Sequence, residues 1–178
     1  MKSEENTLKK LTLIITALFI TACLGNQEAV ATKKGKAKTN SARIKTVHGD
    51  IILKFYPNEA PNTTTRIKAL ISKGFYNGLK FHRVIPGFVI QGGDPKGNGT
   101  GGSGKKLNAE FNSHKHIPGT VAMARSNDPN SADSQFYISL GTHPHLDNKY
   151  TVFGFVQKGL DVAKKINPGD KMISVTLE

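Results

Sequence analysis

The run of residues 81–95 constrains the fold most, because it places one arginine inside a segment that otherwise favours β-strands. Its sequence is Phe-His-Arg-Val-Ile-Pro-Gly-Phe-Val-Ile-Gln-Gly-Gly-Asp-Pro. Aromatic and β-branched residues predict strands on both sides of Pro86-Gly87, where the chain is expected to break. Arg83 has apolar neighbours, so its charge must be paired within the fold or directed at a ligand. Gln91 adds a hydrogen-bonding group on the second strand.

Four further blocks accompany this run, at residues 99–102, 123–125, 134–138 and 152–154. In order and spacing, the run and the blocks resemble the cyclophilin-type peptidyl-prolyl cis-trans isomerases over about residues 43–178. The resemblance implies a mainly β fold, which in this family is a closed eight-stranded antiparallel barrel capped by two α-helices. It also implies an enzyme that rotates X-Pro peptide bonds.

The pattern of the folded part predicts short strands and two helices. A hairpin is expected over residues 44–55 with its turn at Gly49-Asp50, and a helix from about residue 62 to Gly74, with Pro61 in its first turn. Further elements are a strand at 81–91 broken near Pro86-Gly87, strands at 120–124, 135–140, 150–156 and 172–177, and a helix at 160–166. Seven or eight strands without a βαβ rhythm fit a barrel or a sandwich. Only the family resemblance selects the barrel.

The N-terminal segment is typical of an export signal. Lys9 and Lys10 precede an apolar run over residues 11–22, which as a helix would reach roughly 18 Å, short of the ~30 Å hydrocarbon core of a bilayer. Residues 1–22 are therefore interpreted as a signal peptide. The run ends at Cys23, the only cysteine, in a sequence that resembles a bacterial lipobox. Plain cleavage after Ala29 or Ala31 is the alternative.

These features predict three segments and a location. They are a lipoprotein-type signal at residues 1–22, a flexible basic tether at 23–42 and the isomerase-like domain at 43–178. We expect an exported protein of the periplasm or cell envelope, anchored to a membrane by lipid on Cys23. The formal net charge of +12 suits anionic surfaces. No stretch interleaves aromatic and basic residues as nucleic-acid binding would require, and a monomer is expected.

The chemistry of X-Pro rotation points to Arg83. Amide resonance creates a barrier of ~18–20 kcal/mol, and as the amide twists, the prolyl nitrogen recovers its lone pair. A fixed donor aimed at that nitrogen stabilises the twisted form selectively. A guanidinium stays protonated and presents several N–H groups in a rigid fork. The resemblance assigns Arg83 this role, with Gln91 near the rotating carbonyl. The alternative is an Arg83 that only pairs with a carboxylate inside the fold.

The resemblance also places the residues that bind the peptide. Those matching the apolar proline pocket are Phe88, Val89, Tyr137 and Leu146, and those holding the peptide backbone are Ala124, Arg125 and Gln135. Tyr137 departs from the usual phenylalanine and adds a hydroxyl that needs a partner, whereas Phe136 is expected to face the core. His145 stands where cyclosporin-sensitive members have tryptophan, so cyclosporin binding is expected to be weak. Tyr150 replaces a histidine beside the pocket, which predicts little pH dependence near neutrality.

Two motifs suggest other ligands. Residues 99–104 satisfy GxGxxG and residues 99–105 satisfy GxxxxGK, but no helical pattern follows, as a phosphate cradle would require. His114/His116 and His143/His145 form two His-x-His pairs, which could share a metal only if they lay on strands. Neither a cofactor nor a metal is expected.

Two other function classes fit the same sequence. The groove could be a proline-segment binding module or a chaperone at the cell envelope, with isomerisation incidental. Such a module has no need of Arg83 as a donor. The anchor and basic tether could instead dominate, in a surface adhesin.

Overall fold

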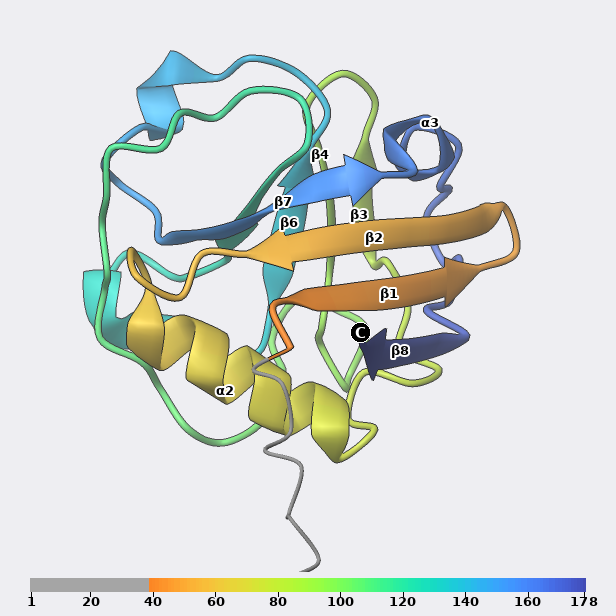
Figure 1. Cartoon of the computed structure of the whole chain (residues 1–178), viewed down its shortest axis with the longest axis horizontal. Coiled ribbons are helices and arrows are strands. Elements are labelled where there is room, and N and C mark those ends of the chain that lie inside the picture. Colours follow the sequence, from red (N-terminus) through yellow and green to blue (C-terminus); the bar gives the residue numbers. More distant parts are fainter. Residues whose placement is uncertain (1–38) are drawn as a thin grey trace, which may run out of the picture. The chain divides into compact units, whose positions relative to one another are not determined.

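One antiparallel sheet of eight strands, in the order β3-β4-β6-β5-β7-β2-β1-β8, is the framework of the domain (Figure 1). The computed structural model describes residues 39–178. The strands are β1 Ser41–Thr46, β2 Gly49–Phe55, β3 Arg83–Ile85, β4 Val89–Gly92, β5 Thr120–Met123, β6 Phe136–Ser139, β7 Val152–Lys158 and β8 Ser174–Leu177. The helices are α2 Pro61–Ser72 and α3 Leu160–Ala163, with single 3₁₀ turns η1 Pro129–Ser131 and η2 Pro144–Leu146. The predicted signal peptide, the lipidated Cys23 and all but the last four residues of the predicted tether lie outside the described residues.

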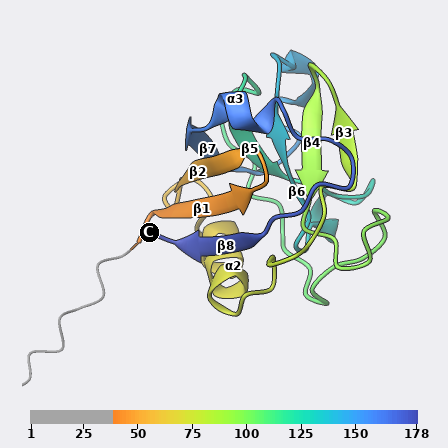
Figure 2. The same cartoon turned by 90° about the vertical axis from the view of Figure 1, so that its right-hand side faces the viewer.

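The sheet is open and curled, so the prediction of a closed barrel is corrected (Figure 2). No ladder joins the edge strands β3 and β8. The segments that precede them meet instead: Phe81 N–H donates to Asp170 O at 2.8 Å, and Met172 N–H donates to Leu79 O at 2.9 Å. The physical reason is that β3 has three residues and β8 four. Edge strands this short leave the seam to a few backbone bonds.

The predicted elements are present, with shifted ends. The break at Pro86-Gly87 separates β3 from β4, and Pro61 opens α2 as expected. The turn of the first hairpin lies at residues 47–48, two residues earlier than predicted, because Gly49 already pairs with Thr46. The Thr46 hydroxyl stabilises this turn by donating to Gly49 O and accepting from the N–H of His48.

The main core lies between the concave face of the sheet and α2. Ile67, Leu70 and Ile71 share one face of α2, as predicted, and all three are buried. They pack with the inward side chains of the sheet, which include Ile44, Ile51, Phe55, Ile138 and Phe153. Full burial of one such side chain stabilises the fold by about 1.5–3 kcal/mol. α2 contacts β8, and α3 contacts β2 (Figure 1).

Helix α2 is capped by a residue from a distant part of the chain. Its N-cap residue, Ala60, has no side chain that can accept a hydrogen bond. The carboxylate of Glu110 takes this role: it accepts from the backbone and side-chain N–H groups of Asn62, both at 2.9 Å, and from the backbone N–H of Thr63 at 2.8 Å. Because a carboxylate also complements the positive end of the helix dipole, Glu110 ties the loop before β5 to α2.

We expect Glu110→Ala to lower the free energy of unfolding at pH 7 by about 1–2 kcal/mol, as the loss of a helix cap does. Burial by itself raises the pKa of Glu110, but the hydrogen bonds from Thr63 and Asn62 outweigh it and lower the pKa below its ordinary 4.5. The stabilisation is therefore complete above about pH 4.5 and is lost as the pH falls through the lowered pKa.

Urea unfolding of the wild type and of Glu110→Ala at pH 7 and pH 3 measures the difference in the free energy of unfolding. Glu59→Ala is the matched control, since Glu59 also lies near the start of α2, but its one ion pair within residues 39–178 is with His114, at 3.9 Å, and not with the helix. The control should change stability by less than about 0.5 kcal/mol. Equal losses in the two variants would contradict the capping role of Glu110.

Candidate active site

A second apolar cluster lies on the face of β4, β5 and β6 that points away from the main core. Its buried members are Val89, Ala122, Tyr137 and Val152. Alternation of side chains along β6 explains this arrangement, because Phe136 and Ile138 enter the main core while Tyr137 points to the opposite face. The prediction that Phe136 faces the core is confirmed.

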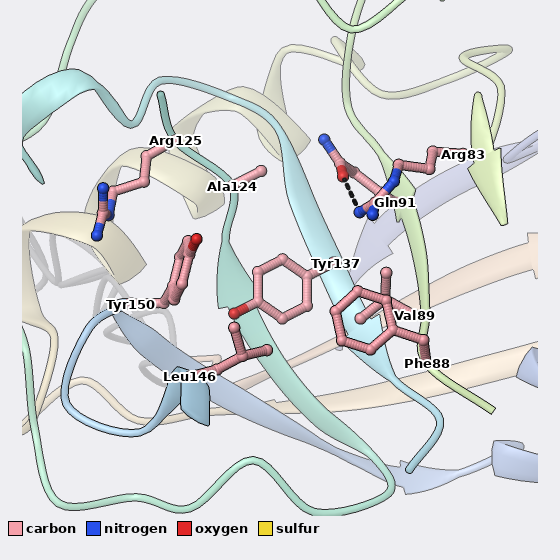
Figure 3. A pocket seen from close by; sticks show the side chains of 9 residues that line it. All are labelled: Arg83, Phe88, Val89, Gln91, Ala124, Arg125, Tyr137, Leu146 and Tyr150. Carbon is pink, nitrogen blue, oxygen red and sulfur yellow. Dashed lines mark hydrogen bonds between the residues drawn. The ribbon is translucent and has the colours of Figure 1, made fainter. Parts of the chain in front are cut away.

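Two members of this cluster, Val89 and Tyr137, line a pocket of about 190 Å³. The side chains around it are Arg83, Phe88, Val89, Gln91, Ala124, Arg125, Tyr137, Leu146 and Tyr150 (Figure 3). All nine were predicted as site residues. The volume is below the ~300 Å³ at which drug-sized pockets begin, so the pocket suits a single apolar side chain.

Arg83 lies at the edge of this pocket beside Gln91 because the two residues are cross-strand partners in the β3–β4 hairpin. Arg83 Nη1 donates to Gln91 Oε1 at 3.3 Å (Figure 3), and the guanidinium carbon lies 5.6 Å from the centre of the Phe88 ring. Among residues 39–178, no ion pair joins Arg83 to a carboxylate. The alternative of an arginine paired inside the fold is therefore wrong for this chain, and the exposed guanidinium is directed to solvent beside the pocket.

A chain of amides fixes the orientation of this pair. Gln91 Nε2 donates to Gln135 Oε1 at 3.0 Å, and Gln135 Nε2 donates to the carbonyls of Gly99 and Gly101 at 3.0 and 2.8 Å. Each donor in this series has an acceptor, so the glutamine amide orientations are determined. Gln135, a predicted site residue, does not line the pocket itself. It lines an adjoining groove together with Gln91, Ala124 and Arg125.

The groove is bordered by the glycine-rich loop, and many of the loop's backbone N–H groups already donate to side chains of the protein. Asp94 accepts from the N–H groups of Lys96, Asn98 and Gly99 at 2.6–3.0 Å. Asp133 accepts in the same way from the backbone N–H groups of residues 103 and 104. Because these donors point at the protein's own carboxylates and no helix follows, the loop cannot act as a phosphate cradle.

Arg125 lies at the opposite rim of the pocket, above Tyr150 (Figure 3). Its guanidinium carbon is 4.6 Å from the centre of the Tyr150 ring, and its N–H groups donate to the carbonyls of Lys149, Ser126 and Asn127. The backbone N–H of Ala124 donates to Gln135 O at 2.9 Å. Within the described residues, no hydrogen bond uses the carbonyl of Ala124 or the backbone N–H of Arg125. These two groups remain available at the groove.

The Tyr137 hydroxyl has the partner that the sequence required but did not identify. His116 Nε2 lies 2.8 Å from this hydroxyl, and His116 Nδ1 lies 3.1 Å from Asp147 Oδ1. Burial lowers the pKa of His116 and raises the pKa of Tyr137, so both side chains are neutral at pH 7. Sequence analysis missed His116 as part of the site, since only tertiary structure brings it below β6.

The two His-x-His pairs do not act as pairs. His114 stacks on Tyr56 at 4.2 Å, whereas His116 is buried behind the pocket. His143 and His145 flank Phe88 instead, with ring centres at 4.7 and 6.2 Å. His145 is thus the one predicted residue that lies beside the pocket without lining it or the groove.

Within residues 39–178, no three His, Cys, Asp or Glu side chains are grouped as a metal site would require. The same part of the chain contains no helix with the length and apolar character needed to cross a membrane.

Residues 41–176 match the family described as cyclophilin type peptidyl-prolyl cis-trans isomerase/CLD. A peptidyl-prolyl cis-trans isomerase from Synechococcus elongatus is 44% identical over 138 residues, which cover 76% of this chain and 94% of the relative. Peptidyl-prolyl cis-trans isomerase B from Bacillus subtilis is 46% identical over 130 residues, covering 72% of this chain and 90% of the relative.

Solved structures agree with the fold. A cyclophilin type isomerase from Cryptosporidium parvum, crystallised in the presence of the dipeptide Ala-Pro, superposes with a TM-score of 0.73 at 28% identity. The match covers 78% of this chain and 98% of that one. A cyclophilin from Hirschia baltica superposes with a TM-score of 0.71 at 27% identity, covering 78% of this chain and 74% of that one.

Proposed function

The chain belongs to the cyclophilin-type peptidyl-prolyl cis-trans isomerases, and from this premise we propose that Arg83 catalyses X-Pro rotation by stabilising the twisted amide. Like the other members of this family, the chain is an enzyme that interconverts the cis and trans forms of the peptide bond before proline. The observation that carries the proposed mechanism is the position of Arg83. It is an exposed guanidinium without a carboxylate partner, held by Gln91 at the edge of an apolar pocket.

The pocket binds the proline ring in this mechanism. Phe88, Val89, Tyr137 and Leu146 surround a volume suited to one apolar side chain. By similarity to the Cryptosporidium parvum isomerase, which was crystallised in the presence of Ala-Pro, we assign the pocket to proline. A ring seated there places its nitrogen within reach of the rim that carries Arg83. As the amide twists, the lone pair returns to this nitrogen and accepts an N–H from the guanidinium.

Backbone contacts hold the peptide during rotation. The free carbonyl of Ala124 and the free N–H of Arg125 present one acceptor and one donor, as a strand edge does for an added strand. Gln91 is oriented by Gln135 and lies near the position of the rotating carbonyl. Since the loop carbonyls of Gly99 and Gly101 fix Gln135, the polar groups need little rearrangement when substrate binds.

We expect Arg83→Ala to lower kcat/KM for a short X-Pro peptide by roughly 10²- to 10³-fold, the usual effect of removing a donor to a transition state. Arg83→Lys should recover only part of this loss, because an ammonium lacks the planar fork. The rate of cis-trans isomerisation of the peptide, measured with each variant, gives kcat/KM. Arg43→Ala is the control, since Arg43 pairs with Asp50 and Glu178 at the β1 edge. Undiminished turnover in Arg83→Ala would refute the mechanism.

Location and clients extend the proposal. The signal-like residues 1–22 and the lone Cys23 support an exported isomerase that is anchored in the cell envelope and assists the folding of exported proteins. Four lysines at positions 33, 34, 36 and 38 support contact of the tether with anionic lipid. The anchor would keep the isomerase where newly exported chains emerge, which is the physical advantage of the arrangement.

Metabolic labelling with palmitate tests the anchor. The wild-type chain should incorporate label and partition with membranes, whereas Cys23→Ala should do neither, because the chain contains no other cysteine. Both proteins should retain isomerase activity, since Cys23 lies outside the family match at residues 41–176. Equal labelling of the two proteins, or no labelling of either, would exclude lipid at Cys23.

His145 supports weak binding of cyclosporin, as expected from the family position at which sensitive members carry tryptophan. The imidazole stacks on Phe88 but offers less apolar area than an indole. We expect His145→Trp to tighten cyclosporin binding by about tenfold or more, measured by titration calorimetry. His114→Trp is the control, because His114 packs on Tyr56 outside the pocket. Equal affinity of the wild type and His145→Trp would contradict this assignment.

A further inference from the structure

We propose that His116 is a positioning residue of the isomerase site. When His116 is neutral, it accepts a hydrogen bond from the Tyr137 hydroxyl and keeps that O–H bond pointing away from the proline pocket. When His116 is protonated, it donates to the Tyr137 oxygen instead, so the O–H bond turns toward the substrate and binding weakens. This inference rests on the assignment of the pocket to the proline ring. It gives this chain an acid-sensitive control of substrate affinity through a side chain that does not touch the substrate.

The geometry begins with a polar group beneath an apolar pocket. Tyr137 is 5% exposed, and its ring forms the floor of the pocket between Val89 and Tyr150, with the hydroxyl end toward Leu146 (Figure 3). In the described part of the chain, His116 is the only hydrogen-bond partner of this hydroxyl. A buried hydroxyl without a partner is costly. The protonation state of His116 therefore decides whether the Tyr137 hydroxyl donates or accepts the hydrogen bond between them.

Asp147 determines the tautomer of His116. Asp147 Oδ1 accepts from the backbone N–H of His116 at 2.8 Å and lies 3.1 Å from Nδ1. A carboxylate only accepts, so the ring proton of neutral His116 resides on Nδ1 and Nε2 is an acceptor. The Tyr137 hydroxyl must then donate to Nε2, which directs its proton away from the pocket. The neutral network Asp147–His116–Tyr137 thereby keeps the pocket floor apolar.

Protonation of His116 reverses the last bond. Nε2 then carries a proton and donates, so the Tyr137 oxygen can only accept from it. The hydroxyl proton must turn elsewhere. Leu146, the pocket wall beside it, offers no side-chain acceptor, and within the described residues no hydrogen bond joins the hydroxyls of Tyr137 and Tyr150 (Figure 3). When a proline ring fills the pocket, this donor is buried without a partner, which penalises binding.

The network also joins two walls of the pocket. Asp147 follows directly after η2, the turn that carries Leu146, and the backbone N–H of His143 donates to His116 O at 2.8 Å. His116 therefore fixes η2 with respect to β6. Its protonation state acts on the side chains that face the proline ring, although its own side chain is fully buried.

Several titratable or charged groups surround His116. They are Asp147, Lys115 at 3.4 Å from Asp147 Oδ2, His143 and His145 on η2 and its flank, Tyr137 on β6, and Tyr150 with Arg125 above it. Burial lowers the pKa of His116 below its ordinary 6.5, and the Asp147 carboxylate partly opposes this shift. The switch therefore acts below neutral pH, outside the range in which the sequence predicts little pH dependence.

The free energy of unfolding also changes in this pH range, but that change does not distinguish a positioning role of His116 from a purely structural one. Because the pKa of His116 is lower in the folded chain than in the unfolded chain, the unfolded state takes up the proton first, and stability falls as the pH drops below about 6.5. A purely structural histidine would show the same loss. The discriminating readout is the KM for an X-Pro peptide, measured where the chain stays folded.

The test compares the KM of the full chain and of Tyr137→Phe between pH 7.5 and pH 4.5. In the wild type we expect KM to rise roughly five- to tenfold on acidification, the effect of burying one unpaired hydroxyl, with kcat changing less than about twofold. Tyr137→Phe removes the hydroxyl and should flatten the profile. This variant keeps His143 and His145, so an acid rise in KM that persists in Tyr137→Phe would overturn the proposal.

Two further variants locate the titrating group. Asp147→Asn removes the anion that favours protonated His116, so the acid rise in KM should move to lower pH. His114→Gln is the matched control and should keep the wild-type profile, because His114 stacks on Tyr56 outside the pocket. A profile unmoved by Asp147→Asn, or moved by His114→Gln, would exclude His116. A wild type that fails to accelerate exchange at pH 7.5 would overturn the function itself, whereas an active wild type with a flat profile would overturn only the role of His116.

Discussion

The alternation of side chains along β6 is the constraint on which the rest of the site depends. Successive residues of a strand point to opposite faces, so Phe136 and Ile138 anchor the strand in the main core while Tyr137 is presented to the pocket. A register shift of one residue would exchange these roles. The large buried aromatic and aliphatic side chains therefore hold Tyr137 in place beneath the pocket, so one strand serves both the packing of the core and the proposed recognition of proline.

Hydrogen bonds extend this rigid arrangement from the sheet to Arg83 at the edge of the pocket. The loop bound by Asp94 and Asp133 offers two carbonyls to Gln135, which orients Gln91 and through it Arg83. In the proposed mechanism, Arg83 is fixed as a donor before substrate arrives and needs no reorganisation as the amide twists, which makes electrostatic stabilisation effective. The glycine-rich loop, although its sequence resembles a phosphate cradle, thus orients Gln135 through its carbonyl groups.

The hydroxyl of Tyr137 gives this chain a property that a phenylalanine there would lack. A polar atom under an apolar pocket must be satisfied from behind, and His116 with Asp147 does so. That solution links the pocket to a titratable group. The rim of the pocket is polar as well. Arg125 lines the pocket and His145 lies beside it, so a guanidinium and an imidazole border the apolar cavity.

Most helices and strands, and the residues that line the pocket, follow from local sequence patterns and the family motif. Pro86-Gly87 divides two strands, Ile67, Leu70 and Ile71 mark one face of a helix, and the motif around Arg83 identifies the site, because local periodicity and residue chemistry are written in short segments. Tertiary structure alone decided what depends on distant contacts. The seam stays open because β3 and β8 are short, Glu110 caps α2 across 48 residues, and His116 meets Tyr137 only once β6 is packed. No local pattern encodes such pairings, since they arise from the folded path of the chain.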